Sequence, residues 1–128
     1  MDFEWIAVIV KGFSRIFSHQ FVRHTWLNFN QRSHRYTPID SFVVPDSFSE
    51  ELKKMYLTQI ERGLEVYKSV KDVHKESLRF ILPQGVSTTL LATGPRLVWE
   101  DFVEKRAISQ AQDEIRKLAM LLKKELGL

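Results

Sequence analysis

The stretch RHTWLNFNQRSHRY, residues 23–36, concentrates side chains that can bind an anion. It holds three arginines, two histidines and a serine, and it contains no acidic residue. Arg23 and Arg35 can each offer a planar guanidinium fork to a phosphate group. Ser33 and backbone amides of the same segment could complete a cradle around it. The residue types therefore indicate a small phosphorylated ligand.

The same stretch lies within a broader basic region of an otherwise balanced chain. The formal net charge is only +3, but residues 11–40 contain five lysines and arginines, three histidines and the single acid Asp40. A local positive field of this kind favours an anionic partner such as a phosphate, a nucleotide or a nucleic acid. An interpretation without a ligand stays open, in which Arg23 caps helix carbonyl groups and Arg35 pairs with Asp40.

Two other classes of site are less compatible with the spacing. His19 and His24 are five residues apart, which separates them by about 140° on a helix and gives a poor geometry for one metal ion. We therefore predict no metal site. The basic residues gather at one helix end and in a loop rather than along a recognition helix, so we do not expect nucleic-acid binding.

The bulk composition indicates one soluble domain over residues 1–128. The absence of cysteine excludes disulfides, zinc–thiolate sites and thiol catalysis. The apolar run from Trp5 to Val10 is too short to cross a bilayer, and it does not have the pattern of a signal peptide. We expect a cytoplasmic protein without membrane contact.

Two predicted strands flank the elements that must position the basic side chains. The run 3–11 and the run 86–93 have the β-branched composition of strands. From residue 13 to residue 21 the apolar residues recur at helical spacing and predict an amphipathic helix. Its predicted inward side chains are Phe13, Ile16, Phe17 and Phe21. Asparagine, aspartate and proline residues that disfavour regular structure predict an irregular segment over residues 28–46. We expect Trp26 and Phe29 in a core or an interface.

Capping signals place the remaining helices. Ser47 and Glu50 form a capping box that predicts a helix from about Phe48. Its predicted apolar stripe is Leu52, Tyr56, Ile60, Leu64 and Tyr67. A further helix over 71–81 would stop before Pro83, because a proline disfavours helix in the residue before it.

The last two helices follow the second strand. Pro95 suits the first turn of a helix that reaches about Arg106, with Thr93 or Gly94 as its cap. Ser109 can cap a final helix. Its predicted inward face is Ile115, Leu118, Ala119, Leu122 and Leu126. The result is a helix-rich α+β chain with two predicted strands, which need covering helices, further strands or a partner chain.

The motifs GFSRIFSHQFVRHTWLNFNQRSHRY, ESLRFILP and AQDEIRKLA resemble the signature of flavin-dependent thymidylate synthases, the ThyX family. That signature reads R-H-R, seven residues, then S-x-R, and it follows a helix similar to SRIFSHQFVRH. The similarity is collinear and covers about residues 5–120. It implies an α+β, helix-rich ThyX-like fold in which helices pack a small antiparallel-type sheet.

The resemblance also implies a reaction and a set of substrate contacts. The family methylates dUMP to dTMP with a flavin (FAD), a reduced nicotinamide (NADPH) and methylenetetrahydrofolate, and the flavin carries the hydride. The positions that match dUMP contacts are Gln20, Arg23, Gln31, Ser33, Arg35, Arg79 and Arg106. Arg106 matches the arginine that stabilises charge on the activated uracil, the one catalytic role that we predict.

The flavin positions are matched less completely. The predicted FAD contacts are Arg23, His24 and Arg96. The third residue of the R-H-R motif is Thr25, the later N-x-R motif falls on Pro95 to Leu97, and Asp101 replaces an asparagine or histidine. Arg96 is thus shifted by one position, which turns it by about 100° on a helix.

Two functional hypotheses follow from this comparison. The first is a flavin-dependent thymidylate synthase. The second is a degenerate relative that binds a nucleotide or another phosphorylated small molecule without flavin chemistry. Family members carry an additional N-terminal region before the strand that matches residues 3–10, so we expect a single domain lacking that region. We also expect a homo-oligomer, because family sites lie between subunits and a short sheet leaves an open edge.

Overall fold

The computed structural model describes residues 4–31 and 41–128. Its elements, in chain order, are β1 (Trp5–Ser14), α1 (Arg15–Phe21), β2 (Asn28–Gln31), α2 (Glu50–Ser69), α3 (Lys75–Leu78), the 3-10 helix η1 (Arg79–Ile81), β3 (Ser87–Pro95), α4 (Arg96–Arg106) and α5 (Asp113–Leu126). Among the described residues no helix is both long enough and apolar enough to span a bilayer.

The three strands form one antiparallel sheet in the order β1-β3-β2, so the last strand in the sequence is the central one. Val10 lies opposite Leu90 on one side, and Asn30 lies opposite Leu91 on the other. The prediction of an irregular segment was wrong for residues 28–31. Asparagine disfavours strands, but the open edge of β3 supplies hydrogen-bonding partners that outweigh this local preference.

A bulge at Gly12 interrupts the regular pairing of β1 with β3, which resumes at Phe13. Gly12 has φ 78°, and the pairing with β3 shifts register between Lys11 and Phe13. Before the bulge Val10 faces the core, whereas after it Phe13 packs against the core, with its ring 4.6 Å from that of Phe17. The predicted helix therefore begins later than expected, because its first inward residue belongs to the strand.

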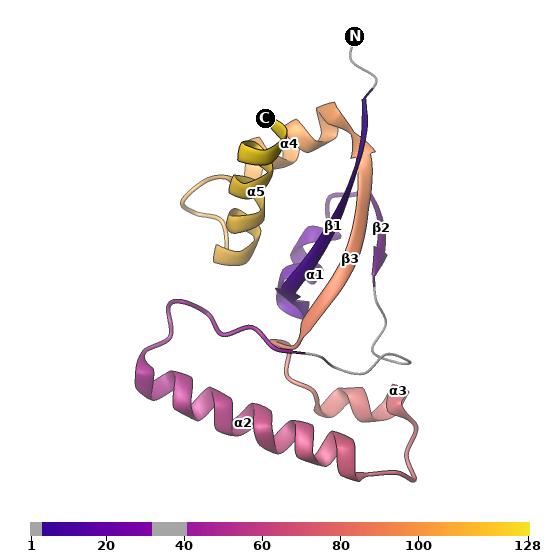
Figure 1. Ribbon diagram of the computed structural model, residues 1–128, viewed down its shortest axis with the longest axis vertical. Helices are drawn as coiled ribbons and strands as arrows, with labels where there is room; N and C mark the ends of the chain where they lie inside the picture. Colours follow the sequence, from indigo (N-terminus) through magenta and orange to yellow (C-terminus); the bar gives the residue numbers. More distant parts are fainter. Residues whose placement is uncertain (1–3, 32–40) are drawn as a thin grey trace.

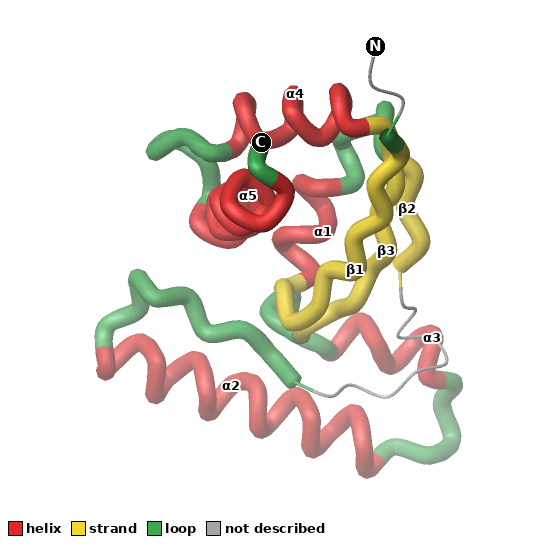
Figure 2. Tube along the Cα trace, turned by 45° about the horizontal axis from the view of Figure 1, so that its top comes forward, coloured by secondary structure: helices red, strands yellow, loops and turns green. Residues whose placement is uncertain are grey.

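The hydrophobic core lies between one face of the sheet and the helices α1, α4 and α5 (Figures 1 and 2). Phe21 is at its centre, with ring centroids 5.0 Å from Phe29 and 5.3 Å from Phe102. Trp99 is fully buried and its indole N–H donates to the Ile6 carbonyl at 3.2 Å. Trp26, predicted for a core or an interface, is 81% exposed in this chain, so the prediction of a core position was wrong.

Helices α2 and α3 lie apart from this core, below the sheet in Figure 1. The predicted helix over 71–81 is present as the short α3 followed by η1. In α2 the predicted stripe is only partly inward, because Ile60 and Tyr67 are buried while Leu52 is 43% exposed. Ile16 of α1, also predicted inward, is exposed as well.

The helix caps differ from the predicted ones by a few residues. Ser49 rather than Ser47 caps α2, since its side chain accepts from Leu52 N. Pro95 is itself the N-cap of α4, and Gln112 rather than Ser109 caps α5. The predicted end of α4 at Arg106 and the predicted inward face of α5 are confirmed, with Leu126 only partly buried.

Candidate functional site

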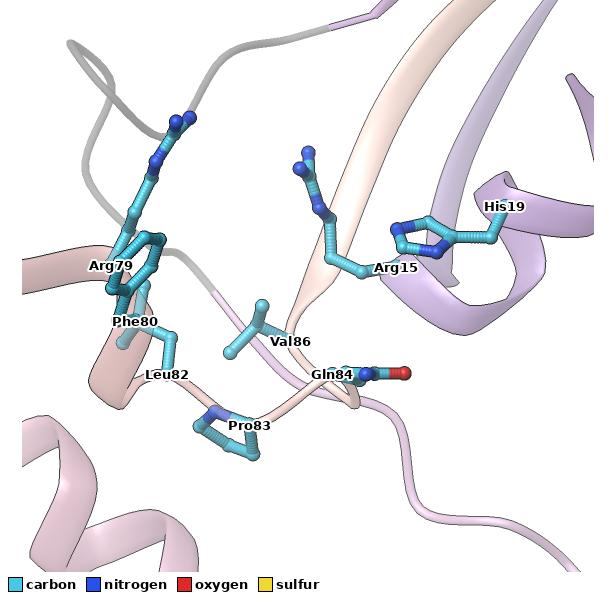
Figure 3. A pocket seen from close by; sticks show the side chains of 8 residues that line it. All are labelled: Arg15, His19, Arg79, Phe80, Leu82, Pro83, Gln84 and Val86. Atoms are coloured by element: carbon cyan, nitrogen blue, oxygen red, sulfur yellow. The ribbon is translucent and has the colours of Figure 1, made fainter. Parts of the chain in front are cut away.

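A cavity of about 480 Å³ lies between α1, η1 and the segment that leads into β3. Arg15 and Arg79 line it from opposite sides, and in Figure 3 their side chains extend in the same direction. His19 lies beside Arg15, because residues four apart occupy one face of a helix. The remaining lining residues are Phe80, Leu82, Pro83, Gln84 and Val86. None of the described lining residues is acidic.

The two guanidinium groups make this cavity electropositive. Partial burial, followed by the positive charge of Arg79, lowers the pKa of Arg15. An arginine still carries its charge at physiological pH after such a shift. Two like charges that share a partly enclosed space without a described acidic neighbour are stabilised when an anion enters between them. The cavity is therefore a candidate anion-binding site.

The backbone around Arg15 is held from several sides. Its N–H lies 3.1 Å from the carbonyl oxygens of both Gln84 and Val86. Its own carbonyl accepts from the Ser18 hydroxyl at 2.8 Å. The preceding residue, Ser14, caps α1 through a bond from Phe17 N to its hydroxyl at 3.1 Å. Arg15 thus projects from a fixed backbone into the cavity.

Arg79 was among the predicted contacts, but Arg15 and His19 were not. The resemblance assigned substrate roles to positions from Gln20 onwards and left the start of that helix unassigned. The available signal was the spacing of Arg15 and His19, which lie four residues apart on a predicted helix within a basic region.

The predicted catalytic residue, Arg106, contacts the predicted flavin contact His24. Arg106 Nε donates to His24 Nε2 at 3.0 Å, across 82 positions of sequence. The His24 ring also packs edge-on against Phe102, with centroids 4.9 Å apart. Burial, followed by the charges of Arg106 and Lys105, lowers the pKa of His24, while Asp101 opposes this shift. The imidazole is therefore neutral and accepts the hydrogen bond.

The other predicted substrate contacts lie around α1. Gln20 is half-buried within α1, and Arg23 is exposed in the turn that follows it. Gln31 lies in β2, and its amide donates to Thr88 Oγ1 at 3.1 Å. Ser33 and Arg35 lie outside the described residues. The structure thus brings Arg79 into the cavity of Arg15, and Arg106 to His24, while Gln20, Arg23 and Gln31 are not among the described lining residues.

Arg96, a predicted flavin contact, is engaged within this chain. Its guanidinium contacts Glu4 Oε2 at 3.1 Å, Glu100 Oε1 at 3.3 Å and the Leu126 carbonyl at 3.0 Å. It lies at the start of α4, whereas Arg106 is the last residue of the same helix. A straight helix of that length separates them by about 15 Å along its axis.

A second cavity, of about 590 Å³, lies along the outer face of α4. Its described lining combines the apolar side chains of Trp26, Leu97 and Val98 with Glu100, Asp101, Glu104 and Lys105. Three carboxylates would disfavour a flavin diphosphate here. With Arg96 engaged and His24 Nε2 occupied by Arg106, the described residues of one chain do not assemble a flavin cradle. Within residues 4–31 and 41–128 there is also no group of three potential metal ligands.

The fold and the cavity define an α+β protein with a candidate anion-binding site, and comparison with known proteins identifies the family. The family profile described as thymidylate synthase complementing protein matches residues 4–127. A flavin-dependent thymidylate synthase of Thermococcus onnurineus is 36% identical over 134 residues, and that of Sulfurisphaera tokodaii is 34% identical over 123. This chain belongs to the thymidylate synthase complementing protein family.

These relatives are longer than the present chain. The alignments cover 95% and 91% of this chain but only 54% and 48% of the two relatives. The chain therefore spans about half the length of the relatives that it matches.

A solved structure confirms the predicted fold. The crystal structure of flavin-dependent thymidylate synthase ThyX from Helicobacter pylori, complexed with FAD and dUMP, superposes with a TM-score of 0.81. The superposition covers 94% of this chain and 66% of that one at 20% sequence identity. The helix-rich fold with a small antiparallel sheet is thus shared.

Proposed function

We propose that this chain binds the phosphate of dUMP between Arg15 and Arg79 and serves in the flavin-dependent methylation of dUMP to dTMP. The observation that carries the proposal is the pair of guanidinium groups facing one cavity with no described acid in its lining. The relatives named flavin-dependent thymidylate synthases and the FAD- and dUMP-bound neighbour support the choice of nucleotide.

In this proposal the remaining predicted contacts hold the sugar and the base of the nucleotide. A nucleotide phosphate held at Arg15 leaves the sugar and base to reach toward the far end of α1. The positions carried over from the family for these contacts are Gln20, Arg23, Gln31, Ser33 and Arg35. From residue 15 to residue 21 the helix rises by roughly 9 Å, which suits an extended mononucleotide.

Arg106 has the catalytic role in the proposal. Its Nε is held by His24, so its terminal nitrogens are oriented without adding a charge of opposite sign beside them. A fixed cation next to a uracil ring stabilises the negative charge that develops when the ring is activated. A neutral histidine suits this task better than a carboxylate, which would neutralise the cation that the reaction needs.

The proposed reaction requires FAD, NADPH and methylenetetrahydrofolate. FAD would carry hydride from NADPH, and methylenetetrahydrofolate would supply the carbon. Since the described residues do not form a flavin cradle, we assign its completion to further residues, either those of another copy in a homo-oligomer or those equivalent to the rest of the relatives. Arg23 remains the exposed candidate for a flavin phosphate in this chain.

Calorimetric titration tests the nucleotide site. The wild-type chain should bind dUMP and inorganic phosphate, and deoxyuridine, which lacks the phosphate, should bind at least about tenfold more weakly than dUMP. Arg15→Ala should weaken dUMP and phosphate together, whereas Arg62→Ala on the exposed face of α2 should change neither. Equal affinity for dUMP and deoxyuridine would overturn the phosphate assignment.

A second experiment tests the reaction. The purified chain, alone and mixed with chain equivalent to the remainder of a relative, is supplied with FAD, NADPH, methylenetetrahydrofolate and dUMP. Formation of dTMP in the mixture, and its loss with Arg106→Lys, would support the proposed activity. A protein that binds dUMP but takes up no flavin in any of these mixtures would instead be a nucleotide-binding relative without this chemistry.

A further inference from the structure

The Glu114 carboxylate, at the start of α5, holds the residue that precedes Arg15. Its Oε2 accepts from Ser14 N at 2.7 Å, and its Oε1 accepts from the Ser14 hydroxyl. The two residues are 100 positions apart in sequence, and Ser14 is only 2% exposed. Both donors of one buried serine are therefore satisfied by one carboxylate, which is the charge-assisted form of hydrogen bonding.

The contact fixes the direction of the Ser14 hydroxyl. A carboxylate accepts hydrogen bonds and has no proton to donate, so the proton of the Ser14 hydroxyl points to Glu114. The oxygen lone pairs are then available to Phe17 N, whose bond to Ser14 Oγ caps α1. Without the carboxylate the hydroxyl could rotate, and the first turn of a seven-residue helix would lose its fixed start.

That first turn carries the anion-binding side chain. Arg15 follows Ser14 directly, and its N–H is held on the other side by the Gln84 and Val86 carbonyls. Glu114 is not among the described residues that line the cavity of Arg15 and Arg79. It can therefore influence an anion in that cavity through the placement of Ser14 and Arg15, without touching it.

We propose that Glu114 is a positioning residue for phosphate binding, acting through Ser14 on Arg15. The inference rests on the proposed function only in assigning the phosphate to dUMP. The anion site itself is tested with inorganic phosphate, whatever the reaction. A guanidinium that has lost its fixed backbone binds the same anion with a poorer geometry and a larger loss of side-chain freedom.

The test measures affinity and stability in the same variants. Glu114→Gln keeps the shape but replaces one acceptor by a donor, so phosphate and dUMP should each bind about tenfold more weakly. Glu114→Asp, which keeps the carboxylate, should retain more affinity than Glu114→Gln. Glu125→Gln, an exposed position on the same helix, is the matched control and should bind as the wild type does.

A loss of stability alone must be separated from a loss of positioning. Leu122→Val, a buried change in the same helix, lowers stability without touching Ser14 and should leave phosphate affinity unchanged at a temperature where all variants are folded. Amide exchange at Ser14 and Phe17 should accelerate in Glu114→Gln and stay slow in Leu122→Val. In the Ser14→Ala background, Glu114→Gln should weaken phosphate binding by less than it does alone.

The outcomes separate the two proposals. If the wild-type chain binds phosphate and Glu114→Gln binds it with the same affinity, the positioning role is overturned, whereas the proposed nucleotide site stands. Equal weakening in Leu122→Val would also overturn it, because stability would then explain the effect. A wild-type chain that binds inorganic phosphate but not dUMP would contradict the proposed function and leave the role of Glu114 standing.

Discussion

The imidazole of His24 accepts a hydrogen bond from Arg106, with 3.0 Å between His24 Nε2 and Arg106 Nε. The acceptor must be unprotonated, so the ring proton lies on Nδ1. A cation is thereby oriented by a neutral group in a partly buried place, next to the aromatic ring of Phe102. The chain thus holds Arg106 in position while the positive charge stays uncompensated by this partner.

This relationship predicts how the stability of the protein depends on pH. Because the folded-state pKa of His24 lies below its unfolded value near 6.5, the folded state binds fewer protons than the unfolded state. The contribution of His24 is fully present above about pH 6.5 and is lost as the pH falls through the folded pKa. Urea unfolding between pH 8 and pH 5 should show this decline.

The variant His24→Phe removes the titrating group and keeps an aromatic ring against Phe102. Its free energy of unfolding should fall less steeply below pH 6.5 than that of the wild type. Thr25→Phe, at the exposed position next to His24, adds an aromatic ring without removing a titrating group; it is the matched control and should keep the wild-type slope. Equal slopes for His24→Phe and the wild type would show that His24 is not the source.

The proximity of the like charges Arg15 and Arg79 predicts that removing Arg79 weakens phosphate binding without a loss of stability. Arg79→Ala removes a cation that repels Arg15, so the free energy of unfolding should stay within about 0.5 kcal/mol of the wild type or rise slightly. Phosphate should bind about tenfold more weakly, because a charged hydrogen-bond partner is lost. Denaturant unfolding and phosphate titration of the same sample measure both. A clear loss of stability with unchanged binding would contradict this account.

The contacts of Arg96 predict a structural effect without a binding effect. Arg96→Met should lower the melting temperature, since bonds to Glu4, Glu100 and the Leu126 carbonyl are lost. Affinity for dUMP should not change. The matched variant Arg62→Met on α2 should change neither quantity. Reduced dUMP affinity in Arg96→Met would mean that this arginine reaches the nucleotide.

Two of the three tryptophans, Trp99 and Trp26, should differ in the cost of the same substitution. Trp99→Phe removes a buried ring and the donor to the Ile6 carbonyl, which should reduce the free energy of unfolding by about 2–3 kcal/mol. Trp26→Phe, at a largely exposed position, should change it by less than about 0.5 kcal/mol. Chemical denaturation measures both. Similar costs would place Trp26 in an interface that survives in solution.

The face of a helix that packs on the core was predictable where burial repeats along it, as in α5, but less so in α2, which lies apart from the core. The inward face of α5 follows directly from apolar spacing, and Pro95 indicated where α4 begins. The strand β2 was not predictable, because its pairing depends on a central strand about sixty residues later. Caps shifted by two or three residues for a similar reason, since several polar side chains near each helix start could serve.

The candidate site was predictable in part. Resemblance pointed to Arg79 and Arg106, but it could not show that Arg15 faces Arg79 or that His24 holds Arg106. Both relationships join residues more than sixty positions apart. They exist because β3 brings the second half of the chain against α1, and no local pattern records such a contact.

The central place of β3 also determines when the sheet can form during synthesis. The edge strands β1 and β2 do not pair with each other, and both require residues 87–95 as their partner. A nascent chain that ends before those residues has no partner for β1 or β2. Its apolar β1 segment therefore stays unpaired, whereas α2 can already form its helix. Assembly of the sheet is therefore a late, long-range event, and such non-local pairing makes folding slow.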